Sequence, residues 1–338
     1  MPARPWSCPR LWLIPLGLCL AGCQSRSVWL FHPRGAVAAT EFHYTLIDFA
    51  IMMLIVGPLL VATAIILMKY RKGRQARYDP HFKRSPILEV LMWSVPIVTV
   101  GVLTYFSYQA VFLADPYNPT AIPRYLAGHD KPAPTAGRSS HFAPYPGPKG
   151  TVQRGPELQV DVITTDWQWV FIYPRRGLAT VDRLVVPVNT PVHFRLTSTT
   201  VVNDFFIPQL VGEIDIMPGM RTKLAMIAAR TGYYRGYSAN FSGGGFSWMG
   251  FATMVVSPEA FRAWAHKVAQ APAHLTYAAF NKIAKPTINL VEKPMYFSHP
   301  QKRLFDHVIH RILMGRVYRT PLRMTENMSK PLIIKVIH

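Results

Sequence analysis

The sequence predicts a membrane hairpin of two helices, followed by an all-β domain and then by amphipathic helices. Three observations lead to this fold class. Two long apolar runs, Phe49–Met68 and Ile87–Phe112, lie close together in the chain. Short segments rich in β-branched and aromatic residues recur between residues 158 and 256. Apolar residues at helical spacing return after Ser257.

The N-terminal residues have the pattern of an export signal. Two arginines precede the apolar run Leu11–Leu20, which is too short to cross a bilayer. The sequence Leu-Ala-Gly-Cys that ends at Cys23 resembles a bacterial lipobox. We therefore expect residues 1–22 to be a lipoprotein signal peptide, and residues 23–45 to be a periplasmic segment that begins with an acylated, palmitate-bearing Cys23. The alternative is an uncleaved anchor with a free thiol.

The cysteines of the chain exclude one kind of metal site. Cys8, Cys19 and Cys23 are the only cysteines, and all lie within the first 23 residues. The rest of the chain can form neither an internal disulfide nor a thiolate-ligated metal centre.

The charge around the two apolar runs predicts their orientation. Phe49–Met68 has no charged residue and is long enough, at about 30 Å, to cross the hydrocarbon core. The connection 69–86 within the predicted hairpin 46–112 contains seven Lys or Arg and one Asp. Short loops with such an excess of positive charge lie in the cytoplasm. Both outer ends of the hairpin therefore face the periplasm, and the protein is predicted to sit in the inner membrane.

Glu89 lies just inside the second apolar run. A carboxylate within a membrane helix is costly and often marks a path for protons or ions. A side chain this close to the end of the run can instead reach the cytoplasmic interface. The residues alone leave both interpretations open.

The second half of the chain begins with a linker, residues 113–156, that is rich in Pro and Gly. Residues 157–257 then show the alternation and spacing of a β-sandwich or small barrel. The predicted strands are Leu158–Ile163, Trp169–Tyr173, Arg183–Val188, Val192–Thr197, Lys223–Ala228 and Thr253–Val256.

The loop Gly236–Met249 has the shape of a metal-binding loop, with polar residues four apart, a glycine run, an aromatic residue and a methionine. It contains no cysteine, histidine or carboxylate, and hydroxyls and amides are poor ligands for copper. His193 is the only histidine between residues 142 and 265, so a structural role is expected for it. Trp167 and Trp169 belong to an aromatic run that fits either core packing or contact with another subunit.

Residues 258–313 are expected to form amphipathic helices, and residues 314–338 a basic tail. Ser257-Pro258 is a helix start, and later helices are predicted near Tyr277–Ala284 and Leu304–Ile312. Much of the formal charge of +20 lies in the cytoplasmic connection and the C-terminal region. The tail is either solvated or in contact with anionic lipid headgroups. The positive residues form no aromatic-interleaved stripe, which argues against nucleic acid as a partner.

With these features the chain resembles subunit II of the haem-copper terminal oxidases, in particular the quinol oxidases of the cytochrome bo type. The segment Glu89–Pro96 is similar to the E-x-x-x-W-[ST]-x-x-P signature of the second span. Asp166–Pro174 is similar to the bo-type aromatic motif. The resemblance implies a cupredoxin-like Greek-key barrel for residues 157–257. It also implies that Glu89 lies at the cytoplasmic mouth of a proton channel into subunit I.

The copper-bearing branch of this family holds a dinuclear copper centre in the barrel. In this sequence the two histidine positions fall on Asn203 and Phe246, and the two cysteine positions fall on Ser238 and Ser242. The glutamate position falls on Asn240, and the methionine position falls on Met249. Only the methionine is kept. The resemblance therefore implies a barrel that binds no metal, as in the quinol-oxidase branch.

The resemblance implies a structural, non-catalytic subunit of a proton-pumping ubiquinol oxidase that reduces oxygen to water. Haems and copper are expected in subunit I, and ubiquinol is the expected substrate of the complex. The expected partners are subunits I, III and IV and membrane lipids, but neither cytochrome c nor nucleic acid. Two alternatives remain at this point: subunit II of a cytochrome c oxidase with an atypical copper site, and a lipidated scaffold or assembly factor outside an oxidase.

Overall fold

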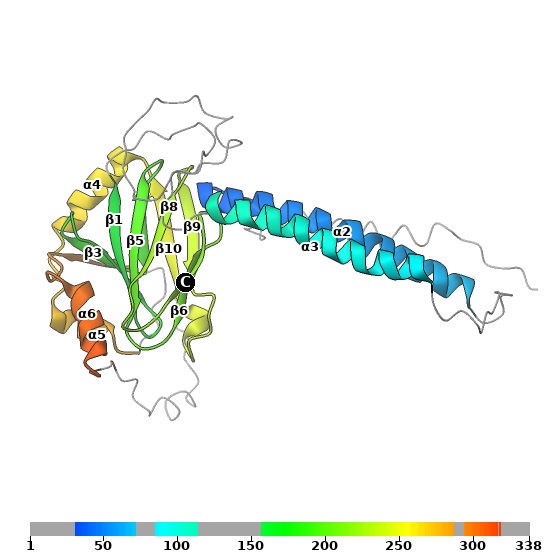
Figure 1. Ribbon diagram of the computed structural model, residues 1–338. Coiled ribbons are helices and arrows are strands. Elements are labelled where there is room, and N and C mark those ends of the chain that lie inside the picture. Colours follow the sequence, from blue (N-terminus) through cyan, green and yellow to red (C-terminus); the bar gives the residue numbers. More distant parts are fainter. Residues whose placement is uncertain (1–30, 72–84, 114–156, 287–293, 317, 319–338) are drawn as a thin grey trace, which may run out of the picture.

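The computed structural model describes residues 31–71, 85–113, 157–286, 294–316 and 318. The expected signal peptide, Cys23, most of the basic connection, the linker and the basic tail lie outside these residues. The described part consists of a helical hairpin that projects from one side of a compact β domain, with short helices on the other side (Figure 1).

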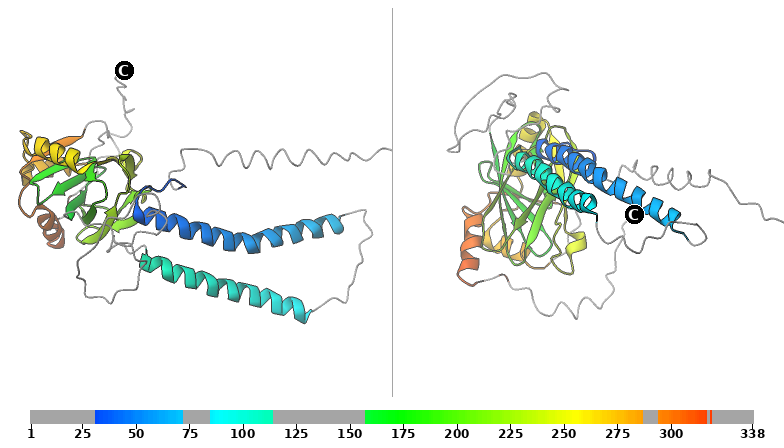
Figure 2. Two further views of the ribbon diagram at one scale, coloured as in Figure 1. Left: turned by 90° about the horizontal axis from the view of Figure 1, so that it is seen from above. Right: turned by 45° about the vertical axis from the view of Figure 1, so that its right-hand side comes forward.

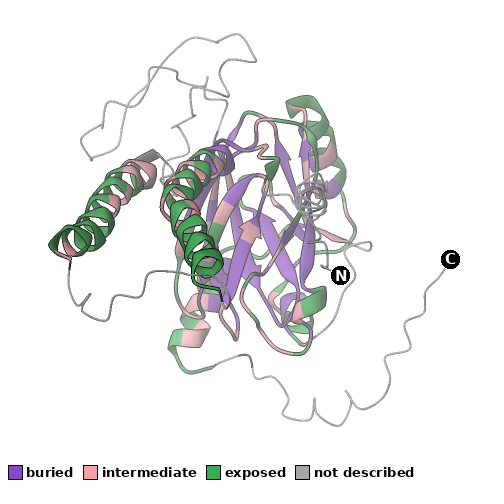
Figure 3. Ribbon diagram, turned by 90° about the vertical axis from the view of Figure 1, so that its right-hand side faces the viewer, coloured by how far each residue is buried: buried purple, intermediate pink, exposed green. Residues whose placement is uncertain are grey.

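The hairpin consists of α2 (Ala36–Lys69) and α3 (Pro86–Leu113), which run side by side away from the β domain (Figure 2). Both helices are long and apolar enough to cross a membrane. Most of their side chains are exposed along their length (Figure 3), as expected for surfaces that face lipid or another subunit. The two predicted membrane helices are therefore present in the structure.

Helix α2 begins ten residues before the predicted start of the hairpin, inside the segment expected to be the periplasmic N-terminus. Its 34 residues span about 51 Å, more than the roughly 30 Å hydrocarbon core requires. The extra length packs on the β domain, where residues 36–40 are buried. Just before the helix, Gly35 donates its backbone N–H to Gln209 O (2.9 Å), and an added Cβ would lie 2.0 Å from Leu210 O. The hairpin is thus joined to the domain by close backbone contact.

The β domain is a sandwich of two sheets. One sheet has the strand order β11-β3-β2-β1-β5-β8, and the other has the order β4-β10-β9-β6-β7. The strands are β1 (Leu158–Thr164), β2 (Trp169–Tyr173), β3 (Leu178–Val181), β4 (Arg183–Pro187), β5 (Pro191–Ser198), β6 (Asn203–Ile207), β7 (Val211–Ile216), β8 (Thr222–Ile227), β9 (Gly232–Tyr237), β10 (Gly250–Val256) and β11 (Met295–Ser298). The cupredoxin-like fold class is confirmed.

Aromatic side chains fill the space between the two sheets. The Trp169 and Phe251 ring centroids are 4.8 Å apart, and Phe205 stacks on Phe251 at 5.3 Å. All three residues are fully buried. Such rings bury large apolar areas and prefer offset or tilted packing. The core therefore reaches the end of the sandwich at which the loop 238–249 lies.

The C-terminal segment packs on the first sheet and against the core between the two sheets. It contains α4 (Pro258–Ala269), α5 (Tyr277–Ile283) and α6 (Leu304–Leu313). The Ser257 hydroxyl accepts a hydrogen bond from Ala260 N (3.2 Å), which confirms the predicted helix start. The segment is not purely helical, because β11 adds to the sheet beside β3.

Helix α6 is held on the sheet by contacts with arginines. Arg195 Nε donates to Asp161 Oδ1 (2.6 Å), and the Arg195 guanidinium carbon lies 4.9 Å from the Phe305 ring centroid. Arg221 forms an ion pair with Asp306 in the first turn of the helix. Phe305 itself is buried, so apolar packing and cation–π contact act together here.

Candidate functional site

The candidate site is the loop between β9 and β10, residues 238–249, together with the start of β6. The loop contains the short helix η4 (Phe246–Trp248) and lies on the side of the sandwich from which the hairpin projects (Figure 1). The six positions that resemble copper ligands fall in these two elements.

Three of the six positions form one hydrogen-bonded group. The Ser238 hydroxyl lies 3.1 Å from Asn240 O and 3.4 Å from Asn203 Oδ1, and it accepts from Asp204 N (3.1 Å). The Asn203 amide donates to Thr164 Oγ1 (3.2 Å), and Asn203 is fully buried. The polar atoms that replace ligands are therefore used in bonds to one another and to the backbone.

The other three positions lie at the far end of the loop. The Ser242 hydroxyl is 3.8 Å from the sulfur of Met249, whose side chain is buried. Phe246, in the place of a histidine, packs edge-on against Phe241 with ring centroids 5.5 Å apart. The structure thus brings together Asn203, Ser238 and Asn240 in one group and Ser242 and Met249 in a second contact, while Phe246 belongs to an aromatic pair.

These residues do not fit a copper centre. A soft copper site needs thiolate and imidazole, and the donors present are hydroxyls, amides and one thioether. The amide and hydroxyl groups of Asn203 and Ser238 are already paired with protein atoms. In the described ranges no group of three His, Cys, Asp or Glu side chains is placed to hold a metal.

Trp167 and Trp169 support this loop from within the domain. Trp167 Nε1 donates to Ser242 O (3.1 Å), and Trp169 Nε1 donates to Met249 O (3.4 Å). Trp169 is fully buried and Trp167 is only 7% exposed. Both side chains are used inside this chain, as in the core-packing alternative, and a contact of either one with another subunit stays a prediction.

Asp204 is a member of the site that the sequence analysis missed. Its side chain is only 6% exposed, and it lies directly opposite Asp215 across the β6–β7 pairing. Burial, the contact with Asp215 and the charge of Glu213 raise the pKa of Asp204 to about 7. Its Oδ1 accepts no hydrogen bond from any described residue, so a proton shared with Asp215 would satisfy it. The sequence could have indicated this residue, because Asp204 directly follows Asn203, the position of the first copper ligand.

Glu89 lies far from this loop, in the first turn of α3, and is half-buried. A carboxylate in the first turn of a helix interacts favourably with the helix dipole. This position agrees with either interpretation of Glu89. Cys23 lies outside the described residues, so its acylation stays a prediction. His193 is half-exposed, and its Nε2 is 3.9 Å from Glu157 Oε2, which fits the expected structural role.

Two family models match consecutive parts of the chain. Residues 158–256 match "Cytochrome C oxidase subunit II, periplasmic domain", and residues 269–315 match "COX Aromatic Rich Motif". The first match covers the two-sheet sandwich and its candidate site. The second covers the C-terminal segment from the end of α4 to α6.

Whole-chain relatives narrow the family further. The chain is 34% identical to the cytochrome bo(3) ubiquinol oxidase subunit 2 of Pseudomonas aeruginosa, over 91% of this chain and 82% of the relative. It is 38% identical to the protein of the same name from Pseudomonas putida, over 83% of this chain and 80% of the relative. It is 34% identical to ubiquinol oxidase subunit 2 of Acetobacter aceti, over 91% and 89%. The chain therefore belongs to the family of ubiquinol oxidase subunit 2.

Proposed function

We propose that this chain is the structural, non-catalytic subunit II of a proton-pumping ubiquinol oxidase in a bacterial inner membrane, with its β domain in the periplasm. One observation carries this proposal: the chain belongs to the ubiquinol oxidase subunits, and hydrogen-bonded amides and hydroxyls occupy the positions of copper ligands. Quinol is lipid-soluble and delivers electrons from within the membrane. A copper relay from a soluble cytochrome is then unnecessary.

The redox chemistry belongs to another subunit in this proposal. Haems and copper are assigned to subunit I, where ubiquinol oxidation is coupled to the reduction of oxygen to water. This chain contributes surfaces that contact subunit I and a residue at a proton-channel entrance, and it holds no electron carrier in this proposal. Neither the atypical copper site of a cytochrome c oxidase nor a scaffold outside an oxidase is favoured by the relatives, which are ubiquinol oxidase subunits.

Subunit I is proposed to contact the hairpin and the loop 238–249. Side chains on the two helices are largely exposed, for example Leu54 at 76% and Trp93 at 68%. In the loop, Phe241 is 74% exposed and Trp248 is 41% exposed, on the side from which the hairpin projects (Figure 1). Clustered exposed aromatics of this kind are typical of protein interfaces. Subunits III and IV and membrane lipids are proposed to cover other parts of the hairpin.

Glu89 is proposed to lie at the cytoplasmic entrance of a proton channel into subunit I. It lies in the first turn of α3, and that helix begins directly after the positively charged connection that the positive-inside rule assigns to the cytoplasm. Acylated Cys23 is proposed to anchor the start of the mature chain at the outer leaflet. Both assignments rest on the predicted orientation of the hairpin, with its connection in the cytoplasm and its outer ends in the periplasm.

Purification of the complex through an affinity tag on this chain tests the proposal. The expected result is co-purification of a haem-bearing large subunit, seen in the reduced-minus-oxidised absorption spectrum. Metal analysis should find copper in the large subunit and none bound by the β domain. Recovery of the chain without any haem protein would favour the scaffold alternative. Copper bound by the β domain would favour the cytochrome c oxidase alternative.

A further inference from the structure

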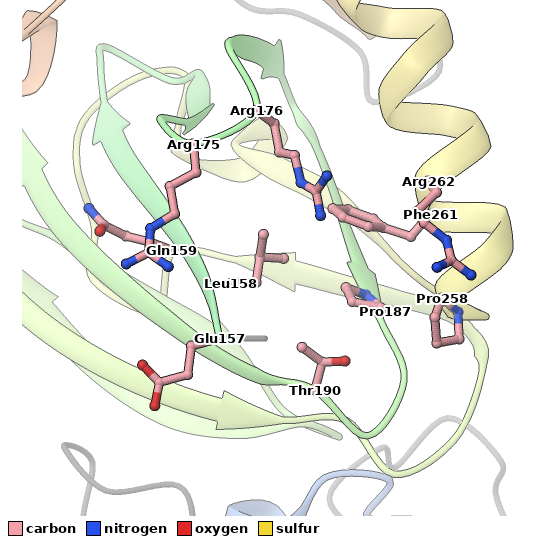
Figure 4. Close-up of a pocket in the computed structure, with 10 residues that line it drawn as sticks. All are labelled: Glu157, Leu158, Gln159, Arg175, Arg176, Pro187, Thr190, Pro258, Phe261 and Arg262. Carbon is pink, nitrogen blue, oxygen red and sulfur yellow. The ribbon is translucent and has the colours of Figure 1, made fainter. Parts of the chain in front are cut away.

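A cavity at one end of the sandwich lies apart from the loop 238–249. It is enclosed by the start of β1, the β2–β3 turn, the end of β4 and the first turn of α4 (Figure 4). Its volume is about 370 Å³. Pockets that bind small ligands occupy roughly 300–1,000 Å³, so this cavity is large enough for a small organic molecule.

The floor of this cavity is apolar. Leu158 and Phe261 are 7% and 3% exposed, and they line it together with Pro187 and Pro258. In Figure 4 the Leu158 side chain lies in the middle of the labelled residues, between the arginines of the turn and Thr190. An apolar part of a ligand would displace water from this surface favourably.

The rim of the cavity is cationic. Arg175 and Arg176 come from the β2–β3 turn, and Arg262 comes from α4. Arg262 is paired with Glu259 (3.0 Å), and the Arg176 guanidinium carbon lies 5.9 Å from the Phe261 ring centroid. Among the described residues Arg175 has neither a hydrogen bond nor an ion pair. Guanidinium groups bind carboxylate and phosphate through paired hydrogen bonds.

The positive charge extends beyond the first cavity. Glu157, Gln159 and Arg175 also line a neighbouring cavity of about 540 Å³ that contains Arg195 and Lys223. Arg195 is neutralised by Asp161, but Lys223 is exposed and has no ion pair within the described ranges. Among the described residues, Glu157 is the one acidic residue that lines either cavity. An anion approaching this end of the domain is therefore attracted over a broad surface.

Two stretches of the chain outside the described residues, 114–156 and 319–338, offer no suitable anionic segment. Residues 114–156, which lead into Glu157, contain five Lys or Arg and two Asp. Residues 319–338 contain four Lys or Arg and one Glu. Like charges disfavour the binding of either segment at an arginine-lined rim. The charge of the rim is better matched by a ligand from outside the chain.

We propose that this cavity binds an anionic amphiphile, a phosphate or carboxylate head on a short apolar chain, from the periplasm. The head is held by Arg175 and Arg176, and the apolar chain lies on Leu158 and Phe261. The cavity lies at the end of the sandwich opposite the loop 238–249, which is proposed to face subunit I. None of the described residues that line the cavity belongs to this loop or to the hairpin helices, so binding is expected to leave the oxidase reaction unchanged.

Calorimetric titration of the purified complex with hexyl phosphate tests this site. Two further probes serve as controls: hexanol, which lacks the anionic head, and inorganic phosphate, which lacks the apolar chain. Hexyl phosphate should bind saturably and more tightly than either. The double variant Arg175→Gln/Arg176→Gln should bind it about tenfold more weakly, because charge-assisted hydrogen bonds are lost. The matched control Lys267→Gln, in the last turn of α4 and outside the cavity, should bind as the unaltered complex does.

Three outcomes would overturn the site: absence of saturable binding, equal binding of hexanol, or equal affinity in the double variant and the Lys267→Gln control. If the double variant fails to assemble, the single variant Arg175→Gln replaces it, because Arg175 is exposed and makes no described contact that assembly needs. Oxygen consumption with ubiquinol is measured in parallel. It should be unchanged, which separates this inference from the proposed function.

Discussion

The indole N–H of Trp167 donates a hydrogen bond to the backbone oxygen of Ser242 at 3.1 Å and joins the β1–β2 turn to the loop 238–249. Trp167 adopts a φ of 79°, a value uncommon for residues other than glycine. Gly245 lies so close to the indole that an added Cβ would be 2.1 Å from Cδ2. A hydrogen bond and close packing against the indole thus hold the loop in place.

The variant Trp167→Phe tests this support. It removes the donor to Ser242 O and should destabilise the loop by about 1–3 kcal/mol. The measurement is the rate of proteolytic cleavage between residues 238 and 249 in the purified complex, which should rise. As a control, Lys267→Gln alters an exposed residue in the last turn of α4, outside the loop, and should leave the rate unchanged. Equal protection in Trp167→Phe and the unaltered complex would contradict the role of Trp167.

Ser238 and Ser242 should respond differently to substitution by alanine. Ser238→Ala removes a buried hydroxyl that accepts from Asp204 N and bonds within the loop, so the melting temperature of the complex should fall by an amount that corresponds to about 1–2 kcal/mol. Ser242→Ala loses only a weak contact to sulfur and should melt almost normally. Ubiquinol oxidase turnover of both assembled variants should be nearly intact. Loss of most turnover in either one would show that the loop has a catalytic role.

Asp204 should make the stability of the domain depend on pH. Its folded-state pKa of about 7 lies above the ordinary value of 3.8, so the folded state binds the proton more tightly than the unfolded state. The stabilisation is complete below about pH 4 and is lost as the pH rises toward 7. The melting temperature of Asp204→Asn minus that of the unaltered protein should therefore be larger at pH 8 than at pH 4.

Asp215→Asn is the matched variant for this measurement. It removes the like charge opposite Asp204, so the pKa of Asp204 should fall and the loss of stability between pH 4 and 7 should become shallower. Identical pH profiles for all three proteins would show that the carboxyl pair does not titrate in this range.

Glu89→Ala should slow turnover by restricting proton uptake, and Glu89→Asp should do so less, because it keeps a carboxylate. Oxygen consumption with ubiquinol and the number of protons pumped per electron measure this. Glu259→Ala is the control: Glu259 also lies in the first turn of a helix, but in the periplasmic domain. An unchanged rate and pumping ratio in Glu89→Ala would support the interpretation that Glu89 only reaches the membrane interface.

The sequence predicted the elements whose apolar pattern is local. Each predicted strand corresponds to an observed one: β1, β2, β4, β5, β8 and β10. Two of the strands that were missed, β7 and β9, lack such a pattern. β7 reads Val-Gly-Glu-Ile-Asp-Ile, and β9 has two glycines and an exposed arginine among its six residues. Their place in the sheet comes from pairing with β6 and β10, which a single sequence does not display.

Long-range contacts explain the remaining differences. β11 lies in the segment expected to be helical and becomes a strand by pairing with β3, more than 110 residues earlier in the chain. The start of α2 depends on its packing against Leu210 and its neighbours. In the candidate site, the six ligand-like positions came from a family motif. The burial of Trp167 and Trp169 and the pairing of Asp204 with Asp215 required the folded structure.

The central claim is that this subunit belongs to an oxidase that takes electrons from quinol without a copper relay in the β domain. The most direct measurement is oxygen consumption by the complex purified through a tag on this chain, with ubiquinol and with reduced cytochrome c as alternative donors. We predict rapid consumption with ubiquinol and only background consumption with cytochrome c. Comparable turnover with cytochrome c as the sole donor would contradict the account.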